Sequence, residues 1–209
     1  MITRLCLIRH GETPWNAERR IQGQIDIDLN QHGLRQARAA GAYLHEESAT
    51  ALYSSDLSRA WATAHAIADA SGLKAESVPE LRERQYGVFE GLTYDEAKLA
   101  HPEVYARFDA REPDFAFPGG GESLVDLSHR VVSALTAIAQ RHCGETVLLV
   151  THGGVLDVVN RFVRGLPLDT PRDFTIPNAG LNWLSLVGER WQIDEWAITA
   201  HLERALDEL

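Results

Sequence analysis

The sequence predicts an α/β protein, a three-layer α/β/α sandwich around a mainly parallel β-sheet. Two short runs, at residues 3–9 and 146–151, have near-continuous apolar stretches of Leu, Ile and Val. Such runs are typical of strands that helices cover on both faces, as in parallel sheets. Amphipathic helical segments alternate with the apolar runs along the chain, and this alternation favours the same architecture.

The predicted elements of the first third follow the strand at 3–9 in order. Residues 33–47 have helical periodicity. The apolar face of this helix is formed by Leu34, Ala37, Gly41 and Leu44. Residues 51–54 fit a second strand, and the helix after it has Ser55 or Asp56 as its predicted N-cap and Gly72 as its stop.

The clearest predicted helix covers residues 124–142, where apolar residues recur at helical spacing. Ser123 and Asp126 stand at its start in the spacing of a capping box. The later predicted elements are the strand at 146–151, a helix at 154–164, and strands at 181–187 and 191–196. Because strands and helices alternate along most of the chain, residues 1–209 are predicted to form a single domain.

Residues 88–122 are less regular, with two short candidate helices and a glycine-rich end at Pro118–Gly121. The region is rich in aromatic side chains: Phe89, Tyr94, Tyr105, Phe108, Phe115 and Phe117. A linker would carry fewer aromatic residues. We therefore predict a lid or specificity segment over the strand ends.

Composition excludes several function classes. The chain has 44% apolar and 24% charged residues, typical of a globular protein. A net charge of −10 disfavours nucleic acid and anionic membranes as partners, so an anionic substrate would need a local basic site. No stretch approaches the roughly 20 apolar residues that cross a bilayer. Cys6 and Cys143 fit neither a disulfide framework nor a metal site, and we expect reduced thiols in a cytoplasmic protein.

Two of the predicted parallel strands end in a histidine followed by glycine, at His10 and at His152. Ligands of such sheets bind beyond the carboxyl ends of the strands. A neutral imidazole is a good nucleophile toward phosphorus, and the guanidinium of Arg9 matches phosphate oxygens. Arg59 lies in the first turn of its predicted helix, where a cation opposes the helix dipole and so indicates a ligand. Gly153 and Gly154 could turn backbone N–H groups toward an anion.

Each of these features alone is more often structural, but their sequence settings together resemble the histidine phosphatase superfamily, the phosphoglycerate mutase-like family. The resemblance extends over about residues 3–160. The matching blocks, in family order, are Leu7–Thr13 with Trp15-Asn16, Gln22–Gln24, Asp28–Asn30 with Gly33, Ser54–Ala60, Leu81–Gly87, Phe89–Gly91, Gly119–Ser123 and Val150–Gly154.

The resemblance implies a role for each site residue. His10 would be the nucleophile that forms phosphohistidine, and Glu83 would be the proton donor, a role that burial beside a phosphate anion favours. The implied phosphate-binding residues are Arg9, Asn16, Gln22, Gly23, Arg59, His152 and Gly153, and Glu12 is interpreted as structural. The cationic side chains would do the work that a metal ion does elsewhere, so neither a metal nor another cofactor is expected.

Two departures from the mutase pattern favour a phosphatase of the family's short branch. The segment from 88 to 121 is short and has only Lys98, Arg107 and Arg111 as basic residues, and His152 is followed by Gly-Gly rather than Gly-Asn. We therefore predict a metal-independent phosphoric monoester hydrolase that acts on a small phosphorylated metabolite. A 2,3-bisphosphoglycerate-dependent phosphoglycerate mutase, an isomerase, is the alternative within the family.

From other classes, a non-catalytic phospho-ligand binding domain and a metal-dependent hydrolase are disfavoured by the complete set of site residues and by the lack of metal-ligand spacing. Residues 181–209 have no recognisable chemistry, although the strands there could form an edge that pairs in a homodimer.

Overall fold

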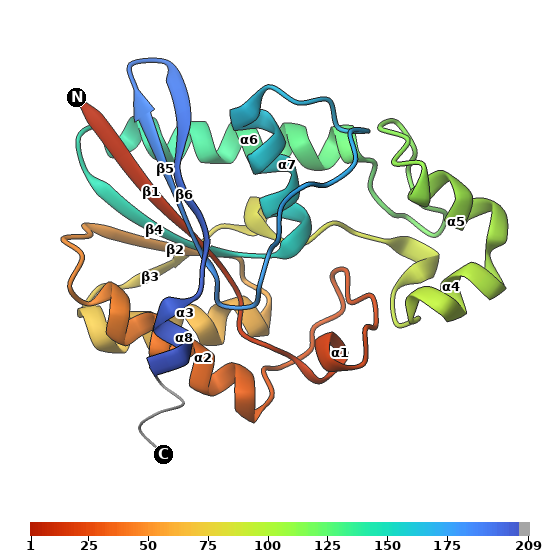
Figure 1. Cartoon of the computed structure of the whole chain (residues 1–209), viewed down its shortest axis with the longest axis horizontal. Helices are drawn as coiled ribbons and strands as arrows, with labels where there is room; N and C mark the ends of the chain where they lie inside the picture. Colours follow the sequence, from red (N-terminus) through yellow and green to blue (C-terminus); the bar gives the residue numbers. More distant parts are fainter. Residues whose placement is uncertain (205–209) are drawn as a thin grey trace.

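The computed structural model of the chain describes residues 1–204 (Figure 1). A six-stranded sheet in the order β3-β2-β4-β1-β5-β6 forms its centre. The strands are β1 (Ile2–Arg9), β2 (Ala51–Ser54), β3 (Ala75–Ser77), β4 (Thr146–Thr151), β5 (Leu181–Val187) and β6 (Arg190–Ile198). β1 to β4 pair in parallel, whereas β5 and β6 are antiparallel additions at one side. The predicted α/β fold with a mainly parallel sheet is confirmed.

Helices cover both faces of the sheet and complete the three layers (Figure 1). The helices of one face are α2 (Gln31–Leu44), α3 (Ser58–Ser71) and α8 (Ala200–Arg204), and those of the other are α6 (Leu124–Arg141) and α7 (Gly153–Arg164). Along β1 the side chains alternate between two cores: Leu5 and Leu7 join the α6–α7 side, and Cys6 and Ile8 join the α2–α3 side. Both faces of β1 are thus apolar, which explains its continuous apolar run. Among the described residues, no helix combines the length and the apolar character needed to span a membrane.

The predicted lid segment contains two short helices, α4 (Tyr94–Ala100) and α5 (Pro102–Asp109), which stand apart from the sheet in Figure 1. One-turn 3₁₀ helices at Pro79–Leu81 and Gly87–Phe89 lead into it. Its buried side chains Phe89, Ala97, Phe115 and Phe117 form a small separate core together with Ile21, from the chain that follows α1. Packing within this core accounts for the aromatic content, and the specificity role of the segment stays a prediction.

The predicted cap of α3 is wrong. The helix begins at Ser58 with Leu57 at the N-cap position, and neither Ser55 nor Asp56 caps it. Instead Asp26, from a distant loop, accepts hydrogen bonds of 2.7 Å from the Ser58 backbone N–H and from its hydroxyl. The carboxylate of Asp56 instead accepts two hydrogen bonds from the guanidinium of Arg82. A tertiary contact from Asp26 therefore replaces the predicted local cap.

Other elements differ from the predictions only at their ends or by their brevity. α2 begins at Gln31, because the side chain of Asn30 accepts a hydrogen bond from the Gly33 N–H, and it ends at Leu44 rather than at residue 47. The capping box of α6 is present as predicted. β3, α8 and the four-residue helix α1 (Pro14–Ala17) are too short to show a periodicity in the sequence.

A close backbone contact joins the end of β1 to the start of α2. A Cβ atom on Gly33 would lie 2.0 Å from the carbonyl oxygen of Glu12, and one on Gly11 would lie 2.4 Å from the carbonyl oxygen of Gly33. The two backbone segments can approach this closely only because both positions are glycine, and their contact fixes the backbone that follows His10.

We therefore expect Gly33→Ala to destabilise the protein by about 1–3 kcal/mol, because backbone must shift to admit the methyl group. Helix propensity alone would give the opposite sign, a gain of about 1 kcal/mol. Urea unfolding distinguishes the two, and Arg38→Ala, at an exposed position of the same helix, serves as control and should change stability by less than about 0.5 kcal/mol. A stabilised Gly33→Ala chain would contradict the steric interpretation.

Candidate active site

The sheet register brings the two predicted histidines together. Arg9 pairs with Thr151 across the parallel strands β1 and β4, so His10 and His152 each follow the last paired residue. Their ring centroids are 5.1 Å apart. Both side chains are almost fully buried, at 2% and 0% exposure. The carboxyl edge of the sheet therefore carries a pair of imidazoles, as predicted.

His10 has the tautomer and the charge state of a nucleophile. Its Nδ1 lies 2.7 Å from the carbonyl oxygen of Gly11. Because a carbonyl oxygen only accepts hydrogen bonds, Nδ1 carries the hydrogen and Nε2 keeps a free lone pair. Burial, followed by the positive charges of Arg59 and Arg9, holds the pKa of His10 well below its usual value. The imidazole is therefore neutral near pH 7.

His152 lies at the N-cap of α7, and its Nε2 is 2.8 Å from the hydroxyl oxygen of Ser55. This oxygen also accepts a hydrogen bond of 3.3 Å from the Leu57 N–H, which leaves the Ser55 hydrogen free to be donated to Nε2. In that arrangement Nδ1 of His152 carries a hydrogen. Nδ1 is buried and has no partner among residues 1–204, so it can donate to an anion. Burial and the charge of Arg59 lower the pKa of His152 as well.

Arg59, which is buried, and Arg9, which is partly buried, lie beside these rings and form no ion pair within the described part of the chain. Arg9 donates to the carbonyl oxygen of Ile176 (2.6 Å), and Arg59 donates to those of Ile25 (2.9 Å) and Gly23 (2.7 Å). The Nε of each guanidinium is buried without a partner among residues 1–204. Backbone carbonyls thus orient both groups and leave donors free for phosphate oxygens.

Glu83 faces the start of α7. Its carboxylate accepts hydrogen bonds from the Gly154 N–H (3.0 Å and 3.1 Å) and from the Arg84 N–H (2.7 Å). A Cβ atom on Gly154 would lie 2.3 Å from Oε1 of Glu83, and one on Gly153 would lie 3.7 Å from Nε of Arg9 and 3.8 Å from Oε2 of Glu83. Gly154 therefore lets the carboxyl group come close to the start of α7, whereas a Cβ atom at position 153 would make only ordinary van der Waals contacts.

The remaining predicted residues lie around this group. Asn16 accepts a hydrogen bond of 3.3 Å from Asn178, which also donates to the carbonyl oxygen of His10 (3.0 Å). The carbonyl oxygen of Gly23 accepts a hydrogen bond from Arg59, and the neighbouring Gln22 is buried with a side-chain oxygen that has no partner among residues 1–204. Glu12 accepts a hydrogen bond of 2.7 Å from Asn30, in keeping with a structural role.

Sequence reasoning missed several supporting residues. Ser55 stands in one of the matching sequence blocks, but the sequence predicts only a capping role for it. Asn178 lies in no matching block and in no predicted helix or strand. Arg130 was also missed; its guanidinium donates to the backbone carbonyls of Arg82 (2.9 Å) and Glu83 (3.0 Å) and so fixes the loop that carries Glu83. Within residues 1–204, no three His, Cys, Asp or Glu side chains form a group that could hold a metal ion.

Comparison with known proteins identifies the family to which the chain belongs. The model of the histidine phosphatase superfamily (branch 1) matches residues 5–199. The chain belongs to this superfamily. The metal-independent phosphoserine phosphatase of Arabidopsis thaliana is 43% identical over 203 residues, which are 96% of this chain and 84% of that protein. The probable phosphoglycerate mutase GpmB of Yersinia pestis (strain Pestoides F) is 38% identical over 214 residues, covering 97% of each.

A solved structure has a similar overall fold. The mycobacterial glucosyl-3-phosphoglycerate phosphatase superposes with a TM-score of 0.83 at 32% identity, over 95% of this chain and 100% of that one. The family predicted from the motifs is confirmed, and the predicted phosphatase class agrees with two of these three relatives.

The buried neutral histidines make stability depend on pH. In the unfolded chain an imidazole binds a proton as the pH falls through its ordinary value of 6.5, whereas the lowered pKa of His10 and of His152 keeps them neutral in the folded protein. The unfolded state then binds more protons, so stability falls with the pH below about 6.5, by up to about 1.4 kcal/mol per pH unit for each histidine.

Urea unfolding between pH 5.5 and 7.5 tests this. The free energy of unfolding should fall more steeply with decreasing pH in the wild type than in His10→Asn, whereas His45→Asn, at an exposed position, should follow the wild type. Parallel curves for the wild type and His10→Asn would show that the pKa of His10 is the same in the folded and the unfolded protein, which would contradict this prediction.

Proposed function

We propose that this chain is a metal-independent phosphomonoesterase that works through a phosphohistidine on His10. The observation that carries the proposal is the buried, neutral His10 with a free Nε2, set between two guanidinium groups that have no carboxylate partner among residues 1–204. Such a pocket offers a nucleophile and permanent positive charge to a phosphoryl group. Small phosphorylated metabolites are the substrates that fit it.

In the first step Nε2 of His10 attacks phosphorus in line with the ester oxygen. The N–P bond forms, the P–O bond to the alcohol breaks, and Glu83 in its acid form gives its proton to the departing oxygen. Arg9, Arg59 and Nδ1–H of His152 donate to the equatorial oxygens. Their positions are fixed before the substrate arrives, so little reorganisation is needed.

In the second step a water molecule attacks the phosphohistidine. Glu83, now a carboxylate, takes a proton from the water, the N–P bond breaks, and inorganic phosphate and neutral His10 are released. The hydrogen bonds from the backbone N–H groups of Gly154 and Arg84 hold the Glu83 carboxylate in place for both steps.

The lid segment supports hydrolysis over transfer to a second hydroxyl. Of its three basic residues, Arg107 is 2.6 Å from the carboxylate of Glu112 on an exposed surface, and Lys98 lies over the ring of Tyr105. Arg111 contacts Asp157 of α7. The segment therefore has few free cations with which to hold a phosphorylated intermediate in place for isomerisation.

The test is phosphate release from a panel of phosphomonoesters, run beside conversion of 3-phosphoglycerate to 2-phosphoglycerate primed with 2,3-bisphosphoglycerate. We expect phosphate release without isomerisation, undiminished by excess EDTA, and a loss of more than about a thousand-fold in His10→Ala. Rapid isomerisation with little hydrolysis would establish a compact mutase, and loss of activity in EDTA would refute the metal-free mechanism.

The acid role of Glu83 gives a separate expectation. Glu83→Gln should lower kcat/KM by about 10²–10⁴-fold for alkyl phosphates, whose alkoxide needs a proton to leave. For p-nitrophenyl phosphate, whose phenolate leaves unaided, the loss should be much smaller. Glu80→Gln, at an exposed position three residues away, is the matched control. Equal losses for both substrates would rule out Glu83 as the acid.

Organisation beyond the site stays a prediction as well. We keep the single domain with residues 88–122 as its specificity segment, the cytoplasmic location, and a homodimer that pairs through the outer strand β6.

A further inference from the structure

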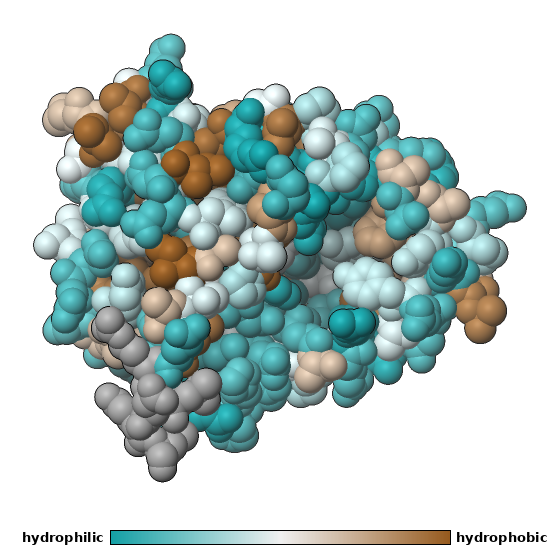
Figure 2. Space-filling model, in the orientation of Figure 1, coloured by the Kyte–Doolittle hydropathy of each residue, from teal (hydrophilic) through white to brown (hydrophobic). Residues whose placement is uncertain are grey.

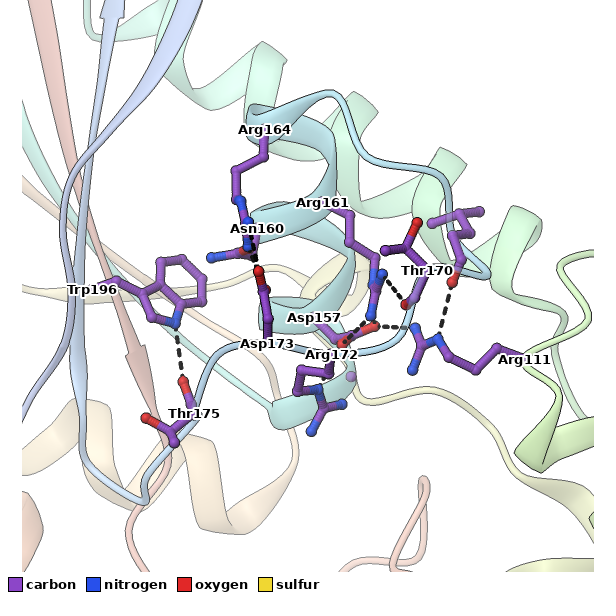
Figure 3. Close-up of polar contacts among 12 residues, drawn as sticks. Arg111, Asp157, Asn160, Arg161, Arg164, Thr170, Arg172, Asp173, Thr175 and Trp196 are labelled. Atoms are coloured by element: carbon purple, nitrogen blue, oxygen red, sulfur yellow. Dashed lines mark hydrogen bonds and ion pairs between the residues drawn. The ribbon is translucent and has the colours of Figure 1, made fainter.

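A cluster of three arginines surrounds one buried carboxylate, that of Asp157 on α7 (Figure 3). Arg161 and Arg111 lie 3.0 Å and 2.5 Å from its Oδ2, and Arg172 lies 2.8 Å from its Oδ1. Burial alone would raise the pKa of Asp157, but the hydrogen bond from Arg161 and the charges of Arg172 and Arg111 keep it below its usual value. Three positive charges against one negative charge leave the cluster strongly basic in an acidic chain.

The three guanidinium groups are not equally occupied. Arg161 is fully buried, and its remaining donors bind the carbonyl oxygens of Pro167 and Thr170. Arg111 binds the carbonyl oxygen of Leu168 through Nε and Asp157 through Nη2. Arg172 uses only Nε, for Asp157, and within residues 1–204 its two terminal nitrogens have no acceptor. Its side chain is 44% exposed.

Arg172 faces the proposed active site. In Figure 3 the terminal nitrogens of Arg172 point away from α7, and Figure 2 shows the molecular surface hollowed between the helices α4–α5 and the sheet. Burial is the main cause that lowers the pKa of Arg9 and raises those of Tyr86 and Tyr94, and the charge of Arg172 makes a smaller contribution at all three. The loop that carries Arg172 also contacts Arg9 directly, through the carbonyl oxygen of Ile176.

We propose that Arg172, held by Asp157, binds a carboxylate of the substrate next to the phosphorylated hydroxyl, with Arg111 beside it. The inference rests on the proposed phosphatase function and narrows the substrate class to phosphorylated hydroxy or amino acids. Two parallel N–H donors of one guanidinium match the two oxygens of a carboxylate. A second phosphate would call for more donors, as the pocket around His10 illustrates with two guanidiniums and an imidazole. The anchor on Asp157 lowers the entropic cost of holding the guanidinium in place.

The test uses two pairs of substrates that differ chiefly in the carboxylate: phosphoserine with phosphoethanolamine, and 3-phosphoglycerate with glycerol 3-phosphate. We expect Arg172→Met to lower kcat/KM about 10–100-fold for the carboxylated member of each pair, the value of one charge-assisted hydrogen-bonded contact. The other member should change less than about three-fold. Arg172→Lys keeps the positive charge but loses the two parallel N–H donors, so its loss of kcat/KM for the carboxylated esters should be smaller than that of Arg172→Met.

Arg164→Met is the matched control, because Arg164 pairs with the exposed Asp173 in the same region and not with Asp157. In each pair, this variant should leave unchanged the ratio of kcat/KM for the carboxylated ester to kcat/KM for the ester without the carboxylate. Equal losses for both members of a pair would overturn the proposal and make Arg172 a structural residue, and so would no loss at all. A loss confined to 2,3-bisphosphoglycerate would assign the site to a second phosphate instead.

The affinity of the proposed carboxylate site can be measured without turnover. The four esters are bound at equilibrium to His10→Ala and to the double variant that also carries Arg172→Met. Phosphoserine should bind more tightly than phosphoethanolamine only when Arg172 is present. A wild type that hydrolyses neither these four esters nor any other of the phosphomonoester panel would refute the phosphatase function, while the binding experiment would still decide the role of Arg172.

Discussion

Two guanidinium groups lie where β1 ends and α3 begins, that of Arg59 buried and that of Arg9 partly buried with its Nε enclosed, and within residues 1–204 neither has a carboxylate to neutralise it. A buried charge without a partner is costly, and backbone carbonyls offset only part of that cost. The site therefore exists in a form that is incomplete until an anion enters. Burial, reinforced by the same two charges, lowers the pKa of His10 and of His152 and keeps both imidazoles neutral. An anion that fills the pocket should also raise the stability of the whole fold.

Much of the structure around the pocket serves to keep these groups fixed. Asp26 caps the helix that begins one residue before Arg59, Arg130 holds the backbone at Glu83, and Asn178 holds the backbone at His10. These contacts come from loops and helices far apart in the chain. Each acts on backbone or on the start of an element rather than on the substrate. A substitution at one of these positions should shift the positions of the site residues without removing any group that contacts the substrate.

The main strands and helices could be predicted because their apolar periodicity is local and strong, as at β1, β4 and α6. The pair of histidines could be predicted because both follow apolar strands that had to be parallel. The cap of α3 could not, because Asp26 is distant in sequence and its competition with Ser55 is decided by tertiary contacts. Nor could the Asp157 cluster, since an acid within a helix reveals nothing of the three arginines that surround it.

The placement of His10 and His152 after paired residues of adjacent strands has a consequence for how the family can diversify. Their separation is set by the hydrogen-bonded spacing of the β-ladder, which few side-chain replacements can alter. The loops that carry Arg172 and the lid residues are not bound by any such ladder. Insertions, deletions and recombination in those loops can exchange one leaving group for another while the reacting atoms keep their distance. Laboratory evolution of new substrates should accordingly accumulate its changes in residues 88–122 and 165–178 and spare the strand ends.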